Sequence, residues 1–253
     1  MNFKILFIFI YMRYQIASDL HIEYLDGAKA SDFIEKKSDI LVLAGDIGSL
    51  YKIDQLTQFL KELNEFKKII YIPGNHEFYM VKGYKPKPFN QLIKSLFELE
   101  KVIPNLVVLN CGTINIDGIN FVGCTLWSDI GENSLPKYRV RIYGFSHIVY
   151  NQQYQKNLNF LKRTLQYQYP NTVVVTHYPP VDLVDNSSKN KFKYLYRNNL
   201  DYMIDKENMS IWNFGHIHIN HSLIKNGVRL ITNQKGRTKD DVQDFEKIFE
   251  IEL

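Results

Sequence analysis

The chain has 253 residues, a net charge of +4 at pH 7 and a hydrophobic content of 45%. This length suits one large domain better than two, and the composition is ordinary for a soluble globular protein. The basic residues are spread along the sequence and form no single block, so charge gives little support for a nucleic-acid partner, although it leaves one open. We expect no membrane partner, and the sequence does not indicate an oligomeric state.

The first eleven residues, MNFKILFIFIY, have an ambiguous role. About nine apolar residues are too few to span a bilayer, and no cleavage site of small residues follows them. We interpret residues 1–11 as an N-terminal extension and residues 12–253 as a single domain. Secretion through residues 1–11 is the alternative to the cytoplasmic location that we favour.

Cys111 and Cys124 are the only cysteines, too few for a disulfide framework. The run TINIDGINFVGC predicts a hairpin turning at Asp117-Gly118, which would place the two cysteines opposite each other. We expect free thiols in a reducing cytosol, with this pair as the one to check.

Short β-rich runs alternate with amphipathic helical patterns along the chain. Strands are predicted over 14–18, 40–45, 68–74, 106–110, 172–177 and 211–216. Helical faces are predicted from Ile53 to Phe66, from Phe89 to Phe97 and from Leu158 to Leu165. A second hairpin turns at Asn226-Gly227, and residues 245–253 read as a closing strand. Early βαβ units followed by hairpins predict an α/β architecture of sheets covered by helices.

Polar side chains follow these strands, and five of the seven histidines are among them. The strand ends carry Asp19, His21, Asp46, Asn75, His76, His177, His216 and His218. Ligands bind beyond the carboxyl ends of strands in such folds, so these side chains are expected to meet at one edge. In an extended segment residues i and i+2 point the same way, which predicts that each D-x-H or H-x-H pair faces one cavity. Glycines at 45, 74 and 215 would let the backbone approach closely.

Carboxylate, imidazole and amide groups together suit Mn, Fe, Zn or Co better than Ca or Mg. Each motif alone is weak, because D-x-H occurs by chance, a buried aspartate can cap a helix and a buried histidine can be a hydrogen-bonded core residue. Because all the motifs occur, each directly after a predicted strand, together they favour a metal site. They are too many for one tetrahedral zinc and suit two metals that share a carboxylate.

The ordered motifs resemble those of the calcineurin-like metallophosphoesterases. The family pattern is D-x-H, G-D, G-N-H-[D/E], H and G-H-x-H, and here it reads SDLH, AGDI, PGNHE, THYPP and FGHIH. The segments VGCTLWSDI and TNQKGR also resemble small bacterial and phage-type members. The resemblance implies an α/β fold, a four-layer α/β/β/α sandwich of two mixed sheets flanked by helices, with a dinuclear metal site at one edge.

The resemblance also divides the ligands between two metals: Asp19, His21 and His218 on the first, Asn75, His177 and His216 on the second, and Asp46 bridging both. Manganese is expected, with iron, zinc or cobalt as alternatives. His76 would be a catalytic residue near the leaving group, as general acid or transition-state stabiliser. A hydroxide bridging the metals would attack phosphorus in line, so hydrolysis of a phosphodiester or phosphomonoester in a small phosphorylated substrate is implied.

Two other functions remain as alternatives, a non-catalytic interaction module on the same fold and a Ser/Thr-type protein phosphatase. The intact ligand set argues against the first. The second would carry G-D-x-V-D-R-G where this chain has GDIGSLY, and purple acid phosphatases place a tyrosine ligand where Ser49 stands. Glu77 is interpreted as either a support for the ligands or a plain surface carboxylate, and His221 as a bystander.

The substrate-binding residues are not identified by sequence. The loops 79–88, 128–147 and 181–200 are expected to rim the pocket, with basic residues that could bind phosphate or be simply solvated. These are Lys82, Lys85, Lys87, Arg139, Arg141, His147, Lys189, Lys191, Lys193 and Arg197, with Arg237 near the C-terminus as a further candidate.

Overall fold

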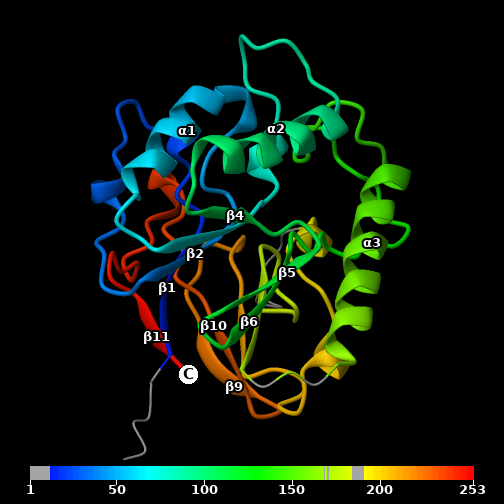
Figure 1. Ribbon diagram of the computed structural model, residues 1–253. Coiled ribbons are helices and arrows are strands. Elements are labelled where there is room, and N and C mark those ends of the chain that lie inside the picture. The colour runs from blue at the N-terminus through cyan, green and yellow to red at the C-terminus, as the bar shows by residue number, and fades with distance from the viewer. Residues whose placement is uncertain (1–11, 168, 170, 184–190) are drawn as a thin grey trace, which may run out of the picture.

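The computed structural model describes residues 12–167, 169, 171–183 and 191–253, so the predicted extension 1–11 lies outside the described residues. Two β-sheets pack against each other (Figure 1). The first has the order β11-β1-β2-β3-β4, in which β1 (Arg13–Ala17), β2 (Ile40–Ala44), β3 (Lys68–Ile72) and β4 (Leu106–Val108) are parallel. The edge strand β11 (Glu250–Glu252) runs antiparallel to β1.

The second sheet has the order β5-β6-β7-β8-β10-β9. Its central strands β6 (Ile119–Cys124), β7 (Thr172–Thr176), β8 (Ile211–Asn213) and β10 (Val228–Ile231) are parallel. The outer strands β5 (Gly112–Ile116) and β9 (Ser222–Lys225) are antiparallel to their neighbours. Both sheets are therefore mixed, as predicted.

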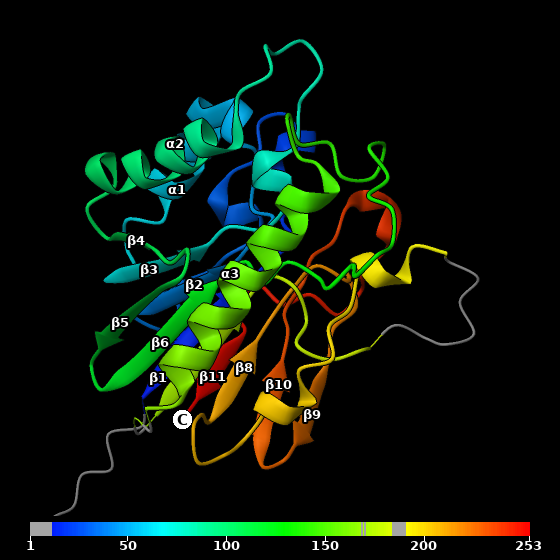
Figure 2. The same ribbon diagram turned by 90° about the vertical axis from the view of Figure 1, so that its right-hand side faces the viewer.

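Three α-helices cover the outer faces of the two sheets. Helices α1 (Ile53–Glu62) and α2 (Phe89–Val102) lie over the first sheet, and α3 (His147–Leu165) lies over the second (Figures 1 and 2). The four layers are thus helix, sheet, sheet and helix. No helix among the described residues is long and apolar enough to cross a membrane.

Strands covered on both faces are apolar along their whole length, because successive side chains enter different cores. In β2, Val42 packs between the sheets with Ile16 and Val173, whereas Leu43 lies in the core under the helices with Leu96. This explains why β2 reads as the unbroken apolar run ILVLA.

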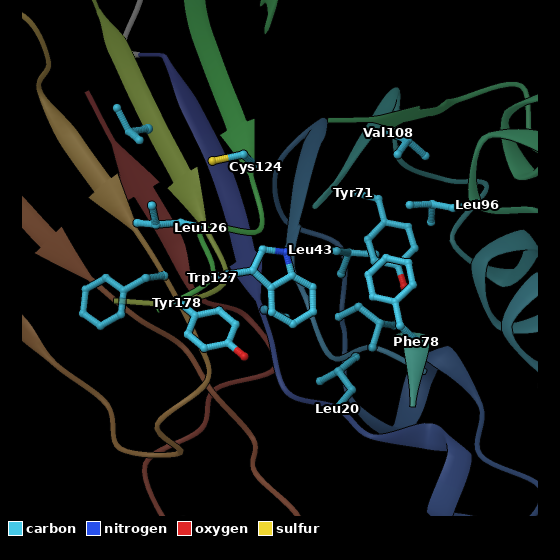
Figure 3. Close-up of a cluster of buried hydrophobic side chains, with 14 of the residues drawn as sticks. Leu20, Leu43, Tyr71, Phe78, Leu96, Val108, Cys124, Leu126, Trp127 and Tyr178 are labelled. Atoms are coloured by element: carbon cyan, nitrogen blue, oxygen red, sulfur yellow. The ribbon is translucent and has the colours of Figure 1, made fainter. Parts of the chain in front are cut away.

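An aromatic cluster packs directly behind the polar strand ends. The ring centroid of Trp127 lies 5.7 Å from that of Tyr178 and 6.3 Å from that of Phe78 (Figure 3). Tyr178 follows His177 in the chain and Phe78 follows Glu77. Packing in this cluster therefore fixes two of the turns that carry the candidate ligands.

The predicted strands are confirmed, but each ends a residue or more early. The chain leaves the extended conformation where the polar residues begin, since φ is positive at Asp19 (55°), His21 (51°), Asp46 (53°), His216 (76°) and His218 (55°). The prediction that each pair is aligned by an extended backbone is therefore wrong. Left-handed turns direct these side chains, and short polar residues tolerate that conformation better than branched ones.

Three predicted boundaries differ from the structure. Helix α1 ends at Glu62 and not at Phe66, α2 continues to Val102, and α3 already begins at His147, where Ser146 caps its first turn. The closing strand is limited to Glu250–Glu252. The periodic apolar pattern gave the position of each helix but not its ends, because capping and packing decide them.

Both predicted hairpins are confirmed. The turn residues Asp117 and Gly118 have φ of 50° and 87°, and Asn226 and Gly227 have φ of 50° and 78°. Gly112 pairs with Gly123 in the first hairpin, so Cys111 and Cys124 fall opposite each other just beyond that pair. Both are free thiols, as expected.

Candidate active site

The strand ends of both sheets contribute to one polar cluster. The first sheet supplies four of its side chains and the second supplies three: Asp19, His21, Asp46 and Asn75 from the first, and His177, His216 and His218 from the second. His76, from the same turn as Asn75, lies beside them. The structure therefore brings together every residue that the sequence placed in the metal site.

The first group of close contacts joins Asp19, His21 and His218. Nε2 of His218 lies 3.2 Å from Oδ1 of Asp19 and 3.1 Å from Nε2 of His21. These three residues offer ligand atoms within 4.8 Å of one another. They lie in the turns that follow β1 and β8, which belong to different sheets.

The second group is centred on Nε2 of His177. This atom lies 3.1 Å from Oδ1 of Asn75 and 3.3 Å from Nδ1 of His216. Oδ2 of Asp46 is 3.3 Å from the same nitrogen and 3.8 Å from Nε2 of His21 in the first group. Asp46 thus lies between the two groups, as a bridging carboxylate would.

Hydrogen bonds to the outer ring nitrogens fix the tautomers in the second group. Nδ1 of His177 donates to the carbonyl of Ala44, and Nε2 of His216 donates to the carbonyl of Leu195, both at 2.9 Å. Because a carbonyl oxygen only accepts, the neutral imidazoles would turn the lone pairs of their inner nitrogens, His177 Nε2 and His216 Nδ1, toward each other across 3.3 Å.

The first group repeats this arrangement with carboxylates as outer partners. Nδ1 of His21 donates to Glu23 at 3.2 Å, and Nδ1 of His218 donates to Asp240 at 2.6 Å. The two Nε2 atoms then face each other at 3.1 Å. Facing lone pairs repel unless a proton or a metal ion lies between them, so both groups, once deprotonated, fit a metal ion that takes imidazole and carboxylate ligands.

Electrostatics within the second group reflect the same demand for a cation. Burial acts to lower the pKa of His177, but Asp46 and Asp19 outweigh it and raise this pKa to about 9. Burial and the charge of His177 lower the pKa of His216 to about 3. Burial acts to raise the pKa of Asp46, but His177 and His76 hold it well below its usual range.

Glu77 supports the turn that carries Asn75 and His76. It is fully buried and accepts hydrogen bonds from the backbone N–H groups of Gly74, Asp46 and Ile47 and from the hydroxyl of Tyr71. Burial beside Asp46 raises its pKa to about 8, while these four donors stabilise the ionised form. The interpretation of Glu77 as a plain surface carboxylate is therefore wrong.

Glycines allow the turns to approach one another as the sequence predicted. A Cβ atom on Gly74 would lie 2.2 Å from Oδ1 of Asp46, and one on Gly215 would lie 2.5 Å from Oδ2 of Asp19. Both distances are far below van der Waals contact. Any larger residue at either position would displace a carboxylate of the cluster.

His76 lies beside the cluster. Among the described residues, no hydrogen bond joins its ring to His177 or His218. Its backbone N–H donates to Oδ1 of Asp46 at 2.7 Å, and its Nδ1 lies 3.2 Å from Oε1 of Glu23. Glu23, His21 and His76 also offer ligand atoms within 4.8 Å of one another. Because both imidazoles turn Nδ1 to the same oxygen of Glu23, this group is explained by two hydrogen bonds to one carboxylate.

A cavity of about 210 Å³ opens in front of these groups. Its floor includes Asp46, Asn75 and His76, and tyrosines at 79, 178 and 196 line its walls. Tyr178 stacks on His216 with ring centroids 3.9 Å apart, and Tyr196 stacks beyond it at 5.2 Å. The cavity therefore reaches the polar cluster along aromatic side chains.

A model of the calcineurin-like phosphoesterase family matches residues 12–220. The chain belongs to the calcineurin-like phosphoesterases. Family membership and the fold support a metal-dependent hydrolase that acts on phosphoesters. The family predicted from the strand-end motifs is confirmed.

This phosphoesterase is similar in sequence or fold to three further proteins. It is 27% identical over 258 residues to an uncharacterised protein of Acanthamoeba polyphaga mimivirus, which covers 87% of this chain and 89% of the other. The phosphopantetheinyl hydrolase of Mycobacterium tuberculosis superposes with a TM-score of 0.73 at 18% identity, over 95% of both chains. A Thermus thermophilus protein gives 0.51 at 12% identity, over 88% and 89%. At these identities the solved structures show a shared fold, which confirms the predicted α/β sandwich.

Three of the basic residues predicted to rim the pocket of this phosphoesterase line the cavity: Arg139, Arg141 and Arg237. Others lie elsewhere. Lys87 stands over the ring of Tyr51, and Arg197 pairs with Asp182 at 2.7 Å. Lys189 lies outside the described residues.

Sequence reasoning missed Glu23 and Asp240, which hold the outer nitrogens of two imidazoles. Glu23 stands two residues after His21, in the run SDLHIE, and this spacing is the one signal that could have indicated it. Asp240 is 22 residues from His218, and only the folded structure joins them. His221 donates its backbone N–H to Thr232 and stays outside the cluster.

Proposed function

We propose that this phosphoesterase hydrolyses small phosphorylated substrates with two divalent metal ions, held by Asp19, His21 and His218, by Asn75, His177 and His216, and by Asp46 between them. The observation that carries this proposal is the pair of inward-facing imidazole nitrogens in each group, with Asp46 in contact with both groups. Manganese is the preferred ion, because the mixed nitrogen and oxygen donors suit it, with iron, zinc or cobalt as alternatives.

Two such ions would act as Lewis acids on the phosphoryl group and lower the pKa of water at the site. The chain's own residues supply the remaining steps. Asn75 contributes a neutral oxygen, so the cluster carries less negative charge toward an anionic substrate. His76 has Nδ1 fixed by Glu23, which leaves Nε2 to deliver a proton to the departing alkoxide.

The ion pairs around His76 suit a proton donor. Burial lowers the pKa of His76, while Asp46 and Glu23 act in the opposite direction and favour its charged form. Burial acts to raise the pKa of Glu23, but the hydrogen bonds from His21 and His76 lower it. Burial outweighs both carboxylates, so the pKa of His76 lies below its usual value, and Glu23 is an ionised carboxylate that opposes this effect of burial.

We also propose a cytoplasmic location, with which two free thiols that face each other are compatible. The substrate can be a phosphodiester or a phosphomonoester. The Mycobacterium tuberculosis protein of the same fold is a phosphopantetheinyl hydrolase by name, which is compatible with a small phosphoester here.

The test compares bis-p-nitrophenyl phosphate and p-nitrophenyl phosphate as substrates, with added Mn²⁺. Asp46→Asn is expected to abolish measurable turnover. His76→Gln is expected to lower kcat about 10²–10⁴-fold with poor leaving groups and less with p-nitrophenolate, which needs little protonation. His221→Gln, a half-buried histidine outside the cluster, is the matched control and is expected to keep its activity.

Two outcomes would overturn the proposal: no hydrolysis with any divalent metal, or full activity in Asp46→Asn. The first would favour the non-catalytic interaction module. Activity on phosphorylated Ser/Thr peptides that exceeds activity on small esters would instead favour a protein phosphatase.

A further inference from the structure

The outer part of the cavity carries positively charged side chains that are not among the proposed metal ligands. Four cationic side chains line it, and Asp46 is the one carboxylate among its lining residues. These cations are Arg139, Arg141, Arg237 and Lys239. Arg237 is already neutralised, since its Nε lies 3.0 Å from Oδ2 of Asp240, the same oxygen that accepts from His218.

Arg139 and Arg141 differ from Arg237, because no carboxylate of the described residues lies within ion-pair distance of either guanidinium. Both guanidiniums lie against aromatic rings. Cζ of Arg139 lies 5.2 Å from the ring centre of Phe192, and Cζ of Arg141 lies 5.7 Å from that of Tyr79. Aromatic faces hold a guanidinium in place and leave its N–H donors available.

The backbone presents both arginines to the cavity. Val140 and Ile142 are 5% exposed and belong to the core, while Arg139 and Arg141, one residue before each of them, are exposed. The carbonyl of Arg141 accepts a hydrogen bond from the N–H of Met80 at 2.7 Å, which ties this segment to the turn after His76. The two cations are thus fixed to the site by packing and by the main chain.

Arg141 lies on the same side of the cavity as His76. Nη2 of Arg141 and Nδ1 of His76 are each 3.4 Å from the hydroxyl of Tyr24. Tyr79 packs against both, with its ring centroid 4.5 Å from that of His76. Since His76 is the proposed proton donor to the leaving group, Arg141 faces whatever is attached to that group, and Arg139 lines the same cavity two residues away.

We infer that Arg139 and Arg141 form a second anion-binding site for the leaving group, so that the substrate is a phosphoester whose departing alcohol carries a further phosphate or equivalent anion. This inference rests on the proposed function for the direction of the leaving group. A planar guanidinium binds phosphate oxygens through two parallel N–H donors, and two guanidiniums on alternate residues suit one phosphate-like group.

The test uses two ethyl phosphodiesters that differ in one group. Ethyl 4-methylphenyl phosphate has a neutral leaving group, and ethyl 4-(phosphonomethyl)phenyl phosphate has the same phenol with a phosphonate on its methyl carbon. With Mn²⁺ present, kcat/KM for the phosphonate ester is expected to exceed that for the neutral ester about tenfold or more, the effect of one charge-assisted contact. Arg141→Gln and Arg139→Gln are each expected to reduce this ratio, and the double variant to bring it close to one.

Lys137→Gln is the matched control, because it removes an equal charge from an exposed position of the same loop that does not line the cavity. Its ratio is expected to equal that of the wild type. A ratio near one in the wild type, or an equal loss in Lys137→Gln and Arg141→Gln, would overturn the inference.

A binding measurement separates this inference from the proposed function. Calorimetry with 4-(phosphonomethyl)phenol on metal-free protein is expected to show binding that Arg141→Gln weakens about tenfold and Lys137→Gln does not. If neither ester is hydrolysed, the proposed function fails, and fragment binding alone decides whether the anion site exists. Fragment binding that is absent, or unchanged in the arginine variants, contradicts the site.

Discussion

Glu23 places one carboxylate oxygen against two imidazoles with different proposed tasks. Oε1 lies 3.2 Å from Nδ1 of the proposed ligand His21 and 3.2 Å from Nδ1 of the proposed proton donor His76. Its other oxygen is buried and has no hydrogen-bond partner among the described residues. Burying a carboxylate oxygen without a hydrogen bond costs free energy of folding. We therefore expect Glu23 to be needed for the orientation of both imidazole rings.

Glu23→Gln keeps the shape of the side chain but removes its charge. We expect metal affinity to fall about 10–100-fold, as for other groups that orient a metal ligand. At saturating Mn²⁺, kcat is expected to fall more for an alkyl or phenyl ester than for a p-nitrophenyl ester, because only the poorer leaving groups need a proton from His76. Glu132→Gln, on an exposed loop, serves as control. An equal loss with every leaving group would show that Glu23 acts through His21 alone.

The raised pKa of His177 makes metal binding depend on pH. A metal ligand must be deprotonated, so a proton on His177 competes with the ion. With a pKa of about 9, the metal-free residue is mostly protonated at pH 7, and Mn²⁺ affinity is expected to rise with pH up to about 9 and to level off above it. His216, with a pKa of about 3, should contribute no proton in this range.

Calorimetry in buffers of different ionisation enthalpy counts the protons released. At pH 7 the release expected from His177 is close to one proton per protein, and it should fall to about half a proton at pH 9 and to about a tenth at pH 10. Proton release that stays constant across this range would contradict the assignment of His177 as the competing site.

At the scale of the elements, the turns after the strands determine the geometry of the cluster. Gly74 ends the connection from β3, and a Cβ atom there would also come within 2.6 Å of the backbone nitrogen of Asp46. Backbone cannot move aside as a flexible side chain can. The turns after β2 and β3 are therefore packed as one unit.

Gly74→Ala is expected to displace Asp46 and to lower Mn²⁺ affinity at least tenfold, with a measurable loss of thermal stability. Calorimetric titration and thermal unfolding measure the two effects. Gly112→Ala, in the edge strand β5, is the control, since its added Cβ would meet Leu109, with the nearest atom, the side-chain Cδ2, at 3.3 Å. Unchanged metal affinity in Gly74→Ala would mean that the turn relaxes without moving Asp46.

The sequence predicted these elements because each strand is an apolar run that ends in polar residues. The run ILVLAGD shows a strand buried on both faces followed by its ligand, and the two hairpins show the Asp-Gly and Asn-Gly turns that the type requires. The left-handed turns at Asp19 and His216 could not be predicted, since spacing alone fits extended backbone equally well.

The missing parts of the site depend on contacts between distant segments. Asp240 meets His218 because residues 238–240 form a short helical turn beside it, and Arg139 faces the cavity because Val140 is held in the core. A basic residue in a loop has no pattern that distinguishes a solvated position from a lining one, which is why sequence named eleven candidates and the structure retains three in the cavity.

At the scale of the whole molecule, the cluster joins the two sheets. Each proposed metal takes ligands from both, since Asp19 and His218 meet in one group and Asn75 and His177 in the other. The sheets are also linked through the core by a 2.6 Å hydrogen bond from the hydroxyl of Tyr14 to Asn213. A metal bound only in the folded state must therefore stabilise the whole sandwich.

Metal addition is expected to raise Tm, because an ion at 100 times its Kd adds about 2.7 kcal/mol per site to the free energy of unfolding. For a protein of this size the rise should be roughly 5–10 °C for each site that is filled. Scanning calorimetry with and without Mn²⁺ measures it, and Asp46→Asn is expected to lose most of the shift. The same rise in that variant would mean that the ion binds elsewhere.

The two unpaired arginines lie on the long connection between β6 and α3, whereas all seven proposed ligands lie in turns locked together by glycines and buried carboxylates. Such a division has an evolutionary consequence. Mutations in the connection can change which ester is accepted without disturbing the catalytic machinery, so relatives that share the strand-end motifs can diverge in substrate through this one segment. The residues between Thr125 and Ser146 are therefore where related chains should be compared when their substrates are sought.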